Sequence, residues 1–450
     1  MAFSKAIKSD TTVLGILALT LPISFAKLIP ELNYLFNAIF LGQLGTIELA
    51  AVGITGVYYL IFSAIGYGLN NSLITIMSRR AGSGETDKIA SVMYHGIFLS
   101  MALAVVFILF TLLFIDGILL GAGIALDEAS ISSSFLKIRI FGLIPLYCFQ
   151  MCTGLVISIS RTRLLMIVVL FSAASNIFLD YSMIFGNFGF PRLGFDGAAY
   201  ASVISEFIGF IVVLLLIVGF RLMQKSNIST KWKFDMALIK LIWKQGLPLM
   251  SQYAISIIAW WFFFIMVSRN YDHEAQAISQ SMRNIFGLSG VFSWAFGSAT
   301  NTIVSNVIGQ GKENEVGKLI AKISTISCTG MVFLVILLNI WPETFLSLYG
   351  QPATFMARAY EPLRIVSVAM ILLVFGVIWL NAVVASGKTT IVFYIELVGI
   401  LAYLAYNYLV MEVYKMSISV AWMSEWIYWS VMFFFSFWYI KSNKWKGNVI

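Results

Sequence analysis

Long apolar stretches and short polar segments alternate along the whole chain. About twelve apolar stretches run for roughly 20 to 30 residues, and a helix of about 20 residues crosses the hydrocarbon core of a bilayer. The strict apolar–polar alternation that marks the strands of a membrane β-barrel is absent from the sequence. The pattern therefore predicts an all-α integral membrane protein with about twelve transmembrane helices.

The composition supports this prediction. Hydrophobic residues make up 60% of the 450 residues and charged residues 11%, with a mean hydropathy of +0.90. Soluble domains carry about 25% charged residues, so this chain could not cover its own surface in water. We expect a lipid bilayer to surround it.

The positions of Lys and Arg predict the orientation of the chain. If the amino terminus is cytoplasmic, most of these residues fall in cytoplasmic segments, as the positive-inside rule requires. Both termini are then cytoplasmic. The net charge of +8 reflects this topology, and no nucleic-acid partner is expected. Two further cations, Lys27 and Arg283, fall inside apolar stretches.

The two halves of the sequence resemble each other. Leu21-Pro22 recurs as Leu247-Pro248, the glycines at 82 and 84 recur at 309 and 311, and a motif near Ile138 recurs near Leu363. The three landmarks keep their order, with offsets of 225 to 227 residues. A repeat of this length indicates two copies of one structural unit.

An even number of spans in each copy makes both copies enter the membrane from the same side. We therefore predict two parallel six-helix lobes, residues 1–225 and 236–450, with pseudo-two-fold symmetry about the membrane normal. A cytoplasmic linker, residues 226–235, joins them. Two lobes that can rock against each other suit transport by alternating access better than they suit an enzyme.

Four segments resemble the multidrug and toxic compound extrusion (MATE) transporters, a family of the MOP flippase superfamily. They are NAIFLGQLGTIELAAVGI from Asn37 to Ile54, the turn Gly82-Ser83-Gly84, the stretch from Asn176 to Glu206, and ASGKTT from Ala385 to Thr390. The stretch from Asn176 to Glu206 resembles the family's signature for helices five and six most closely. The four segments span nearly the whole chain and occur in the order that the family has.

The resemblance implies an antiporter that exports amphipathic small molecules, driven by entry of H⁺ or Na⁺. It implies no other cofactor, a bacterial inner-membrane location, and a monomer. It also assigns Asn176, Asp180 and Ser202 to a cation or proton site. A first-helix acid completes this site in many members, but this chain has Asn37 at that position. Na⁺ could bind at Asp180, Asn176 and Asn37.

The chemistry of Asp180 supports this role independently. Asn176 and Asp180 are four residues apart and share one helix face, and an isolated carboxylate at bilayer depth costs several kcal/mol. Taking up a proton removes that charge, whereas carboxylate, amide and hydroxyl oxygens together suit Na⁺ as hard ligands. In the structural alternatives, Asp180 neutralises a Lys or Arg, or caps a broken helix.

The first helix offers a substitute for the missing acid. Glu31 lies four residues after Lys27, on a face that Tyr34 continues, and Pro30 can bend the helix. Either Glu31 replaces the acid missing at Asn37, or Lys27 neutralises Glu31 as a structural pair.

The second half contributes candidates for a substrate-binding cleft. Arg283 shares a helix face with Gln280 and needs a partner, for which Glu396 and Glu206 are the candidates. Interior cations favour a neutral, anionic or zwitterionic substrate, and an aromatic substrate could stack on Trp260. The predicted cleft comprises Lys27, Tyr34, Arg283, Gln280, Asn381 and Trp260.

Other functions have weaker support. His95 and His273 fall near the ends of spans in different halves, and no HExxH or GxSxG motif occurs, so we do not expect an enzyme. Cys148, Cys152 and Cys328 fit packing between helices better than a metal site. The nearest alternative is a lipid or lipid-linked saccharide flippase of the same superfamily, which the interior cations favour and the span count disfavours.

Overall fold

A computed structural model describes residues 6–226, 228, 233–347 and 353–448, except for the side chains of residues 30–36, 38, 39, 42, 46, 49, 50, 225, 353 and 354. Every regular element in these ranges is helical. The fold is therefore all-α, as predicted from the apolar pattern.

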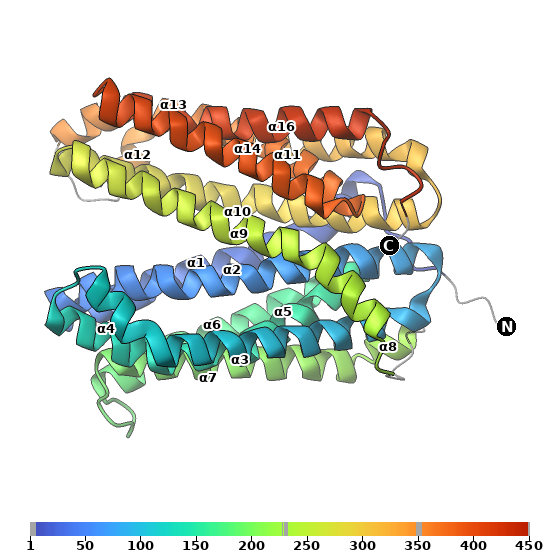
Figure 1. Cartoon of the computed structure of the whole chain (residues 1–450), viewed down its shortest axis with the longest axis horizontal. Helices are drawn as coiled ribbons and strands as arrows, with labels where there is room; N and C mark the ends of the chain where they lie inside the picture. The colour runs from blue at the N-terminus through green and yellow to red at the C-terminus, as the bar shows by residue number, and fades with distance from the viewer. Residues whose placement is uncertain (1–5, 227, 229–232, 348–352, 449–450) are drawn as a thin grey trace. The chain divides into compact units, whose positions relative to one another are not determined.

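The chain divides into two compact units. The first combines Met1–Ile7 with Leu21–Met250, and the second combines Lys8–Thr20 with Ser251–Ile450. Within the first unit the long helices run alongside one another (Figure 1). The helices of the first half of the chain are α1 (Val13–Gly42), α2 (Thr46–Ser83), α3 (Ile89–Gly121), α4 (Leu126–Arg139), α5 (Leu143–Ser158), α6 (Arg163–Phe185), α7 (Phe195–Gly219) and the short α8 (Leu222–Lys225).

The second unit is also a bundle of long helices. They are α9 (Met236–Asn270), α10 (His273–Gly309), α11 (Val316–Ile340), the short α12 (Pro342–Leu346), α13 (Ala353–Ala385), α14 (Thr389–Tyr408), the short α15 (Ile418–Trp422) and α16 (Ser424–Lys441). A five-residue π-helix, Leu409–Val413, continues α14. Three-residue 3-10 turns lie at Thr86–Lys88, Ile140–Gly142 and Glu313–Glu315.

Nine helical segments in the described part of the chain are long and apolar enough to cross a membrane. Helices α4 and α5 form one of them, because the 3-10 turn Ile140–Gly142 joins them without a break. Three further long helices are less uniformly apolar over their described residues: α1, α10 and α16. Together these segments match the twelve predicted spans, six in each half.

The repeated Leu-Pro marks a change of unit in two helices. Helix α1 passes from the second unit to the first between Thr20 and Leu21, next to Pro22. Helix α9 passes from the first unit to the second between Met250 and Ser251, two residues after Pro248. The boundary therefore lies inside α9, whereas the predicted linker, residues 226–235, belongs to the first unit and lies partly outside the described residues.

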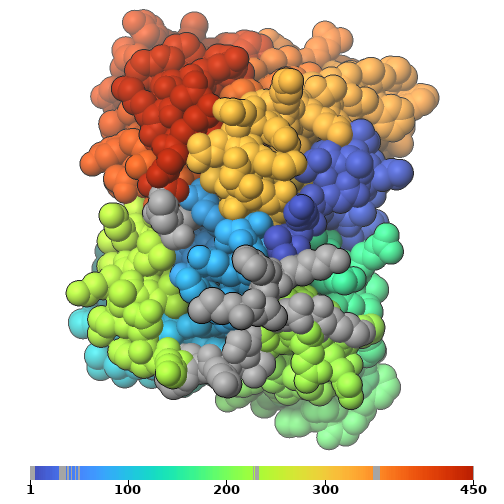
Figure 2. Space-filling model, turned by 90° about the vertical axis from the view of Figure 1, so that its right-hand side faces the viewer, coloured from blue at the N-terminus to red at the C-terminus, as the bar shows by residue number. Residues whose placement is uncertain are grey.

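Hydrogen bonds hold the beginning of the described chain to the second unit. The Ser9 amide donates to Oδ1 of Asn306 at 3.0 Å, and Nζ of Lys322 donates to the Thr11 carbonyl at 2.7 Å. Figure 2 shows these blue residues beside the yellow-orange surface of α10 and α11. Residues 8–20 are thus an integral part of the second unit.

A buried histidine anchors the segment before α9. The His95 ring contacts the Ser91 carbonyl through Nδ1 at 2.7 Å, and Nε2 accepts from the Asp235 amide at 2.9 Å. Nε2 must therefore be unprotonated, which leaves the proton on Nδ1. The Asp235 carboxylate accepts from the Ala237 amide at 2.8 Å and caps the start of α9. His95 thus has a structural role at the junction between α3 and α9.

Candidate coupling site

Asp180 is a fully buried acid of the first unit. It lies on α6 with 0% of its surface exposed. In the described part of the chain, neither carboxylate oxygen has a hydrogen-bond partner, and no basic side chain forms an ion pair with Asp180. In the described part of the chain, Asp180 therefore forms no direct ion pair and no helix-capping hydrogen bond.

The neighbouring amide is equally enclosed. Asn176 lies one turn before Asp180 and is buried, and its Nδ2 has no hydrogen-bond partner in the described chain. The predicted shared face of α6 is therefore a buried polar face. A buried polar group without a partner costs roughly 1–3 kcal/mol, so this pair is unfavourable unless something else occupies the space beside it.

Packing brings α7 to the level of Asp180. Leu179 and Ala201 belong to one buried cluster, and the next residues along the chain are Asp180 and Ser202. The two helices also approach closely at Gly197, where an added Cβ would lie 2.7 Å from the Met183 carbonyl oxygen. The structure thus places Ser202, which is buried, at the same level of the α6–α7 pair as Asp180.

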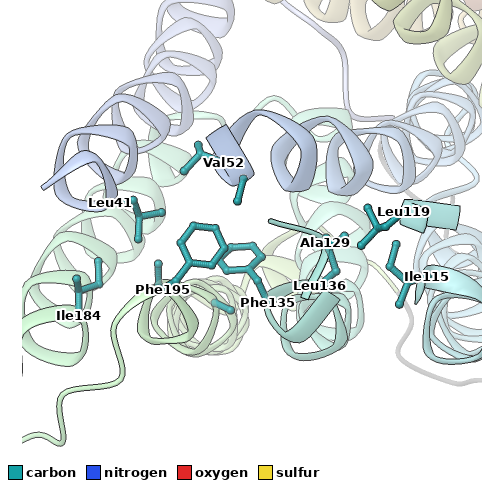
Figure 3. Close-up of a cluster of buried hydrophobic side chains, with 12 residues drawn as sticks. Leu41, Val52, Ile115, Leu119, Ala129, Phe135, Leu136, Ile184 and Phe195 are labelled. Carbon is teal, nitrogen blue, oxygen red and sulfur yellow. The ribbon is translucent and has the colours of Figure 1, made fainter. Parts of the chain in front are cut away.

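Packing also brings α1 to this level. Leu41 of α1 and Ile184 of α6 share a buried apolar cluster (Figure 3), and the ring of Phe40 lies 6.2 Å from that of Tyr181. Leu41 lies four residues after Asn37, and Ile184 four residues after Asp180. Because one helical turn separates each pair, Asn37 and Asp180 lie one turn from the cluster on matching faces.

Asn37 contributes an oxygen to this region. Its side chain is partly buried, and Oδ1 has no hydrogen-bond partner among the described residues. The side chains of Glu31 and Tyr34 lie outside the described residues. Whether Glu31 replaces the missing acid therefore stays open, and Na⁺ binding at Asp180, Asn176 and Asn37 stays a prediction.

A second buried acid of the first unit, Glu206, forms an ion pair with Arg139, a cation that the sequence analysis did not identify. Arg139, at the end of α4, donates from Nη1 and Nη2 to the two Glu206 oxygens at 2.8 and 2.6 Å. The Tyr59 hydroxyl donates to the same carboxylate at 3.2 Å, and the guanidinium lies 3.6 Å from the centroid of the Tyr59 ring. Gly142 leaves room for this pair, because an added Cβ would lie 2.2 Å from Oε2 of Glu206.

This network reaches the predicted site. The charge of Arg139 is close enough to act on Asp180, although its ion pair is with Glu206. The sequence analysis singled out Lys27 and Arg283 as interior cations and did not identify Arg139. The missed signal is that Glu206 lies on the predicted sixth span, where a lone acid requires a basic partner.

The two partners proposed for Arg283 are wrong. Glu206 pairs with Arg139, and Glu396 accepts hydrogen bonds from Ser256, Gln252 and Tyr428. The guanidinium of Arg283 instead lies 5.5 Å from the centroid of the Phe264 ring. Arg283 therefore makes a cation–π contact with Phe264, and an aromatic ring attracts a cation without neutralising its charge.

The other residues of the predicted cleft have local partners. Lys27 lies 5.6 Å from the centroid of the Tyr67 ring, Gln280 is exposed, and Nδ2 of Asn381 donates to the Val377 carbonyl at 2.9 Å. Trp260 donates from Nε1 to Glu425 at 3.2 Å. A pocket of about 420 Å³ in the second unit, beside Trp341 and Tyr360, contains none of these residues. Their role in a substrate cleft stays a prediction.

Comparison with known sequences identifies the family. A profile of the MatE family matches residues 22–182 and 248–409. The chain belongs to the MatE family. The two matched regions begin at Pro22 and Pro248, the prolines of the repeated Leu-Pro, so the MatE unit occurs twice, as the internal repeat indicated.

Curated MatE relatives match part of the chain. A probable multidrug resistance protein NorM from Halalkalibacterium halodurans is 31% identical over 219 residues, which cover 48% of this chain and 47% of that protein. A probable NorM from Synechocystis sp. is 25% identical over 284 residues, covering 62% and 61%. The matched regions thus span about half to three fifths of these relatives.

Solved MATE structures share the fold along the whole chain. An outward-facing multidrug resistance MATE transporter of the MOP superfamily gives a TM-score of 0.88 at 17% identity, covering 99% of both chains. A MOP superfamily transporter from Pyrococcus furiosus, described as having a binding pocket of reverse polarity, gives 0.87 at 17% identity with the same coverage. These likenesses establish the MATE fold, a multi-pass bundle of transmembrane helices.

Proposed function

We propose that this protein is a secondary active antiporter that exports amphipathic small molecules, driven by H⁺ or Na⁺ entering at Asp180. Membership of the MatE family and the names of the NorM relatives support multidrug efflux. The observation that carries the proposal is the complete burial of the Asp180 carboxylate, with no hydrogen-bond partner in the described chain.

The buried charge of Asp180 requires compensation by a bound proton or cation. A buried carboxylate that lacks a partner costs several kcal/mol. Binding a proton or a Na⁺ ion removes that cost, and releasing it restores the cost, so occupancy can favour one conformation over another. An ion that crosses the membrane potential releases about 2.3 kcal/mol per charge per 100 mV, which can drive a second solute outward.

The proposed cycle is alternating access, with Asp180 loaded from the outside and unloaded into the cytoplasm. The distribution of Lys and Arg supports cytoplasmic termini. The half-buried Lys27 and Arg283 favour neutral, anionic or zwitterionic substrates. The protein would act as a monomer in the bacterial inner membrane, with no cofactor besides the coupling ion.

Transport by proteoliposomes with an imposed pH or Na⁺ gradient tests this proposal. We expect the native protein to accumulate members of a panel of dyes and drugs of different charge, and Asp180→Asn to abolish the gradient-driven part. Asp116→Asn is the matched control, because it removes the charge of an exposed acid of the same unit. Gradient-driven transport by Asp180→Asn at the native rate would refute the coupling role.

The alternative function is flipping of lipids or lipid-linked saccharides. The guanidinium of Arg283 favours it, because this partly buried cation lies over Phe264 and could receive an anionic headgroup. Scrambling of labelled lipid by proteoliposomes that show no gradient-driven dye transport would favour the flippase.

A further inference from the structure

A pocket of about 420 Å³ opens in the second unit where the end of α11, the short α12 and the first turns of α13 meet. Its volume lies within the range of about 300–1,000 Å³ that is typical of small-molecule sites. At this level one candidate span, Glu313–Ile340, ends and the next, Phe355–Ala385, begins. The pocket therefore lies near the depth at which the headgroups of membrane lipids are found.

Two hydrogen bonds between helices fix the walls of this pocket. Nδ2 of Asn339, on α11, donates to the Ser367 hydroxyl of α13 at 2.8 Å. The Tyr360 hydroxyl of α13 donates to Oε1 of Glu343, on α12, at 3.1 Å. Arg364 lies four residues after Tyr360 and three before Ser367, so these residues share one face of α13. Arg364 therefore lies between the two contacts and lines the pocket.

The pocket is lined by one cation and one acid that do not neutralise each other. Arg364 and Glu343 both line it, and in the described ranges neither forms an ion pair. Only Oε1 of Glu343 accepts from Tyr360, and a carboxylate can accept through both oxygens. The pocket thus offers a guanidinium to a phosphate and a carboxylate oxygen to an ammonium group.

An exposed apolar stripe on α11 leads to this pocket. Val332, Ile336 and Ile340 follow one another at intervals of four residues and share one helix face, with Phe333 beside them. Between 36% and 62% of each is exposed. Trp341 follows at the rim of the pocket and is 55% exposed, as is typical of tryptophan at a membrane interface. The stripe offers a surface to acyl chains next to a site for the headgroup.

We propose that this pocket binds the headgroup of a phosphatidylethanolamine lipid, with its phosphate at Arg364 and its primary ammonium at Glu343. Basic pockets between membrane helices are known to bind lipid headgroups. A phosphatidylglycerol headgroup would leave the Glu343 carboxylate without a cation. The quaternary ammonium of phosphatidylcholine has no N–H, so it cannot donate a charge-assisted hydrogen bond to Glu343. The site lies apart from Asp180 and does not depend on its role.

Lipid binding to the purified full-length protein in detergent tests this site. Native mass spectrometry measures the affinity for dihexanoyl phosphatidylethanolamine, phosphatidylcholine and phosphatidylglycerol, each added alone. We expect phosphatidylethanolamine to bind about 10-fold more tightly than the other two, the effect of one hydrogen bond between charged groups. Equal affinities for the three lipids would overturn the assignment.

A soluble competitor distinguishes a lipid from a free ligand with the same headgroup. Glycerophosphoethanolamine has the phosphate and the ammonium but no acyl chains. It should compete at least about 10-fold more weakly than the lipid, because it buries no apolar surface against the stripe on α11. Competition at the same concentration as the lipid would show that the pocket binds a soluble ligand instead.

Two variants separate the contributions of the two charges. Arg364→Gln removes the cation for the phosphate and should weaken binding of all three lipids by about 10-fold. Glu343→Ala removes the acceptor for the ammonium and should abolish the preference for phosphatidylethanolamine over phosphatidylcholine. Arg269→Gln is the matched control, because it changes an exposed cation of the same unit that does not line the pocket.

The changed side chains are exposed, so the unfolding temperatures of the lipid-free variants should stay close to that of the unmodified protein. Unaltered affinity for phosphatidylethanolamine after Arg364→Gln would refute the site. A preference for phosphatidylethanolamine that survives Glu343→Ala would refute the role of the acid.

Discussion

The two units of this MatE protein treat their buried acids differently. In the first, Arg139 holds Glu206 with two charge-assisted hydrogen bonds, while Asp180 has no partner in the described chain. In the second, Glu396 and Glu425 both have partners, but all of them are neutral. The first unit thus has one acid that is neutralised by an arginine and one acid that has no hydrogen-bond partner. In the second unit, both acids are hydrogen-bonded by neutral groups only.

The proposed exchange of an ion depends on this difference. A carboxylate held by a guanidinium already has its counter-charge, and separating a buried pair is costly. Indole, amide and hydroxyl donors orient a carboxylate without neutralising it, so a proton or cation can still bind. This difference supports a structural role for Glu206 and the proposed coupling role of Asp180.

The largest effect on stability should follow loss of the Arg139 cation. Arg139→Met leaves the Glu206 carboxylate buried and unpaired, which should destabilise the protein by about 3–5 kcal/mol and lower its unfolding temperature in detergent. The double variant Arg139→Met/Glu206→Leu removes both charges and should regain most of this loss. Equal unfolding temperatures for the native protein and Arg139→Met would show that Glu206 does not depend on its cation.

A smaller loss should follow removal of one indole donor in the second unit. Trp429→Phe removes the 2.9 Å hydrogen bond to Glu425 and should cost about 1–3 kcal/mol, measured as thermal unfolding of the purified protein. Trp260→Phe removes the longer bond of 3.2 Å from a less buried residue and should cost less. A loss after Trp429→Phe as large as that after Arg139→Met would remove the distinction between neutral and charged partners.

The smallest effect should follow disruption of an exposed ion pair of the first unit. Lys137 and Asp116 are 2.7 Å apart, with 37% and 59% of their side chains exposed. Lys137→Met should cost less than about 1 kcal/mol, and added salt should reduce the difference from the native protein further. A large, salt-insensitive loss would show that exposure does not distinguish this pair from Arg139–Glu206.

Local patterns in the sequence were sufficient to predict the transmembrane helices and to identify Asp180 as a candidate site residue. An apolar stretch of this length forms a helix in a bilayer whatever its neighbours are, because lipid offers the backbone no other hydrogen-bond partner. Asp180 was predictable for a related reason, since a charge within such a stretch stands out. Its lack of a hydrogen-bond partner was not predictable, because residue order does not show which side chains of other helices lie beside it.

The pairing of charges was decided by packing. Arg139 lies 67 residues from Glu206 along the chain. From the sequence alone, Glu206 was also a candidate partner of Arg283. The environment of Glu425 likewise combines residues of α9, α14 and α16, of which only Trp260 was noticed for its own chemistry.

The sequence by itself determined that this is a helical membrane protein of twelve spans, built from two related halves, with an unusual acid in the fifth span. These properties depend on contacts with lipid or on spacing within one helix, which residue order specifies directly. Only the tertiary structure decided which acids are neutralised, which are held by neutral donors, and which polar atoms remain vacant. A charge interacts with whatever lies within a few ångströms, and the packing of distant helices sets those neighbours.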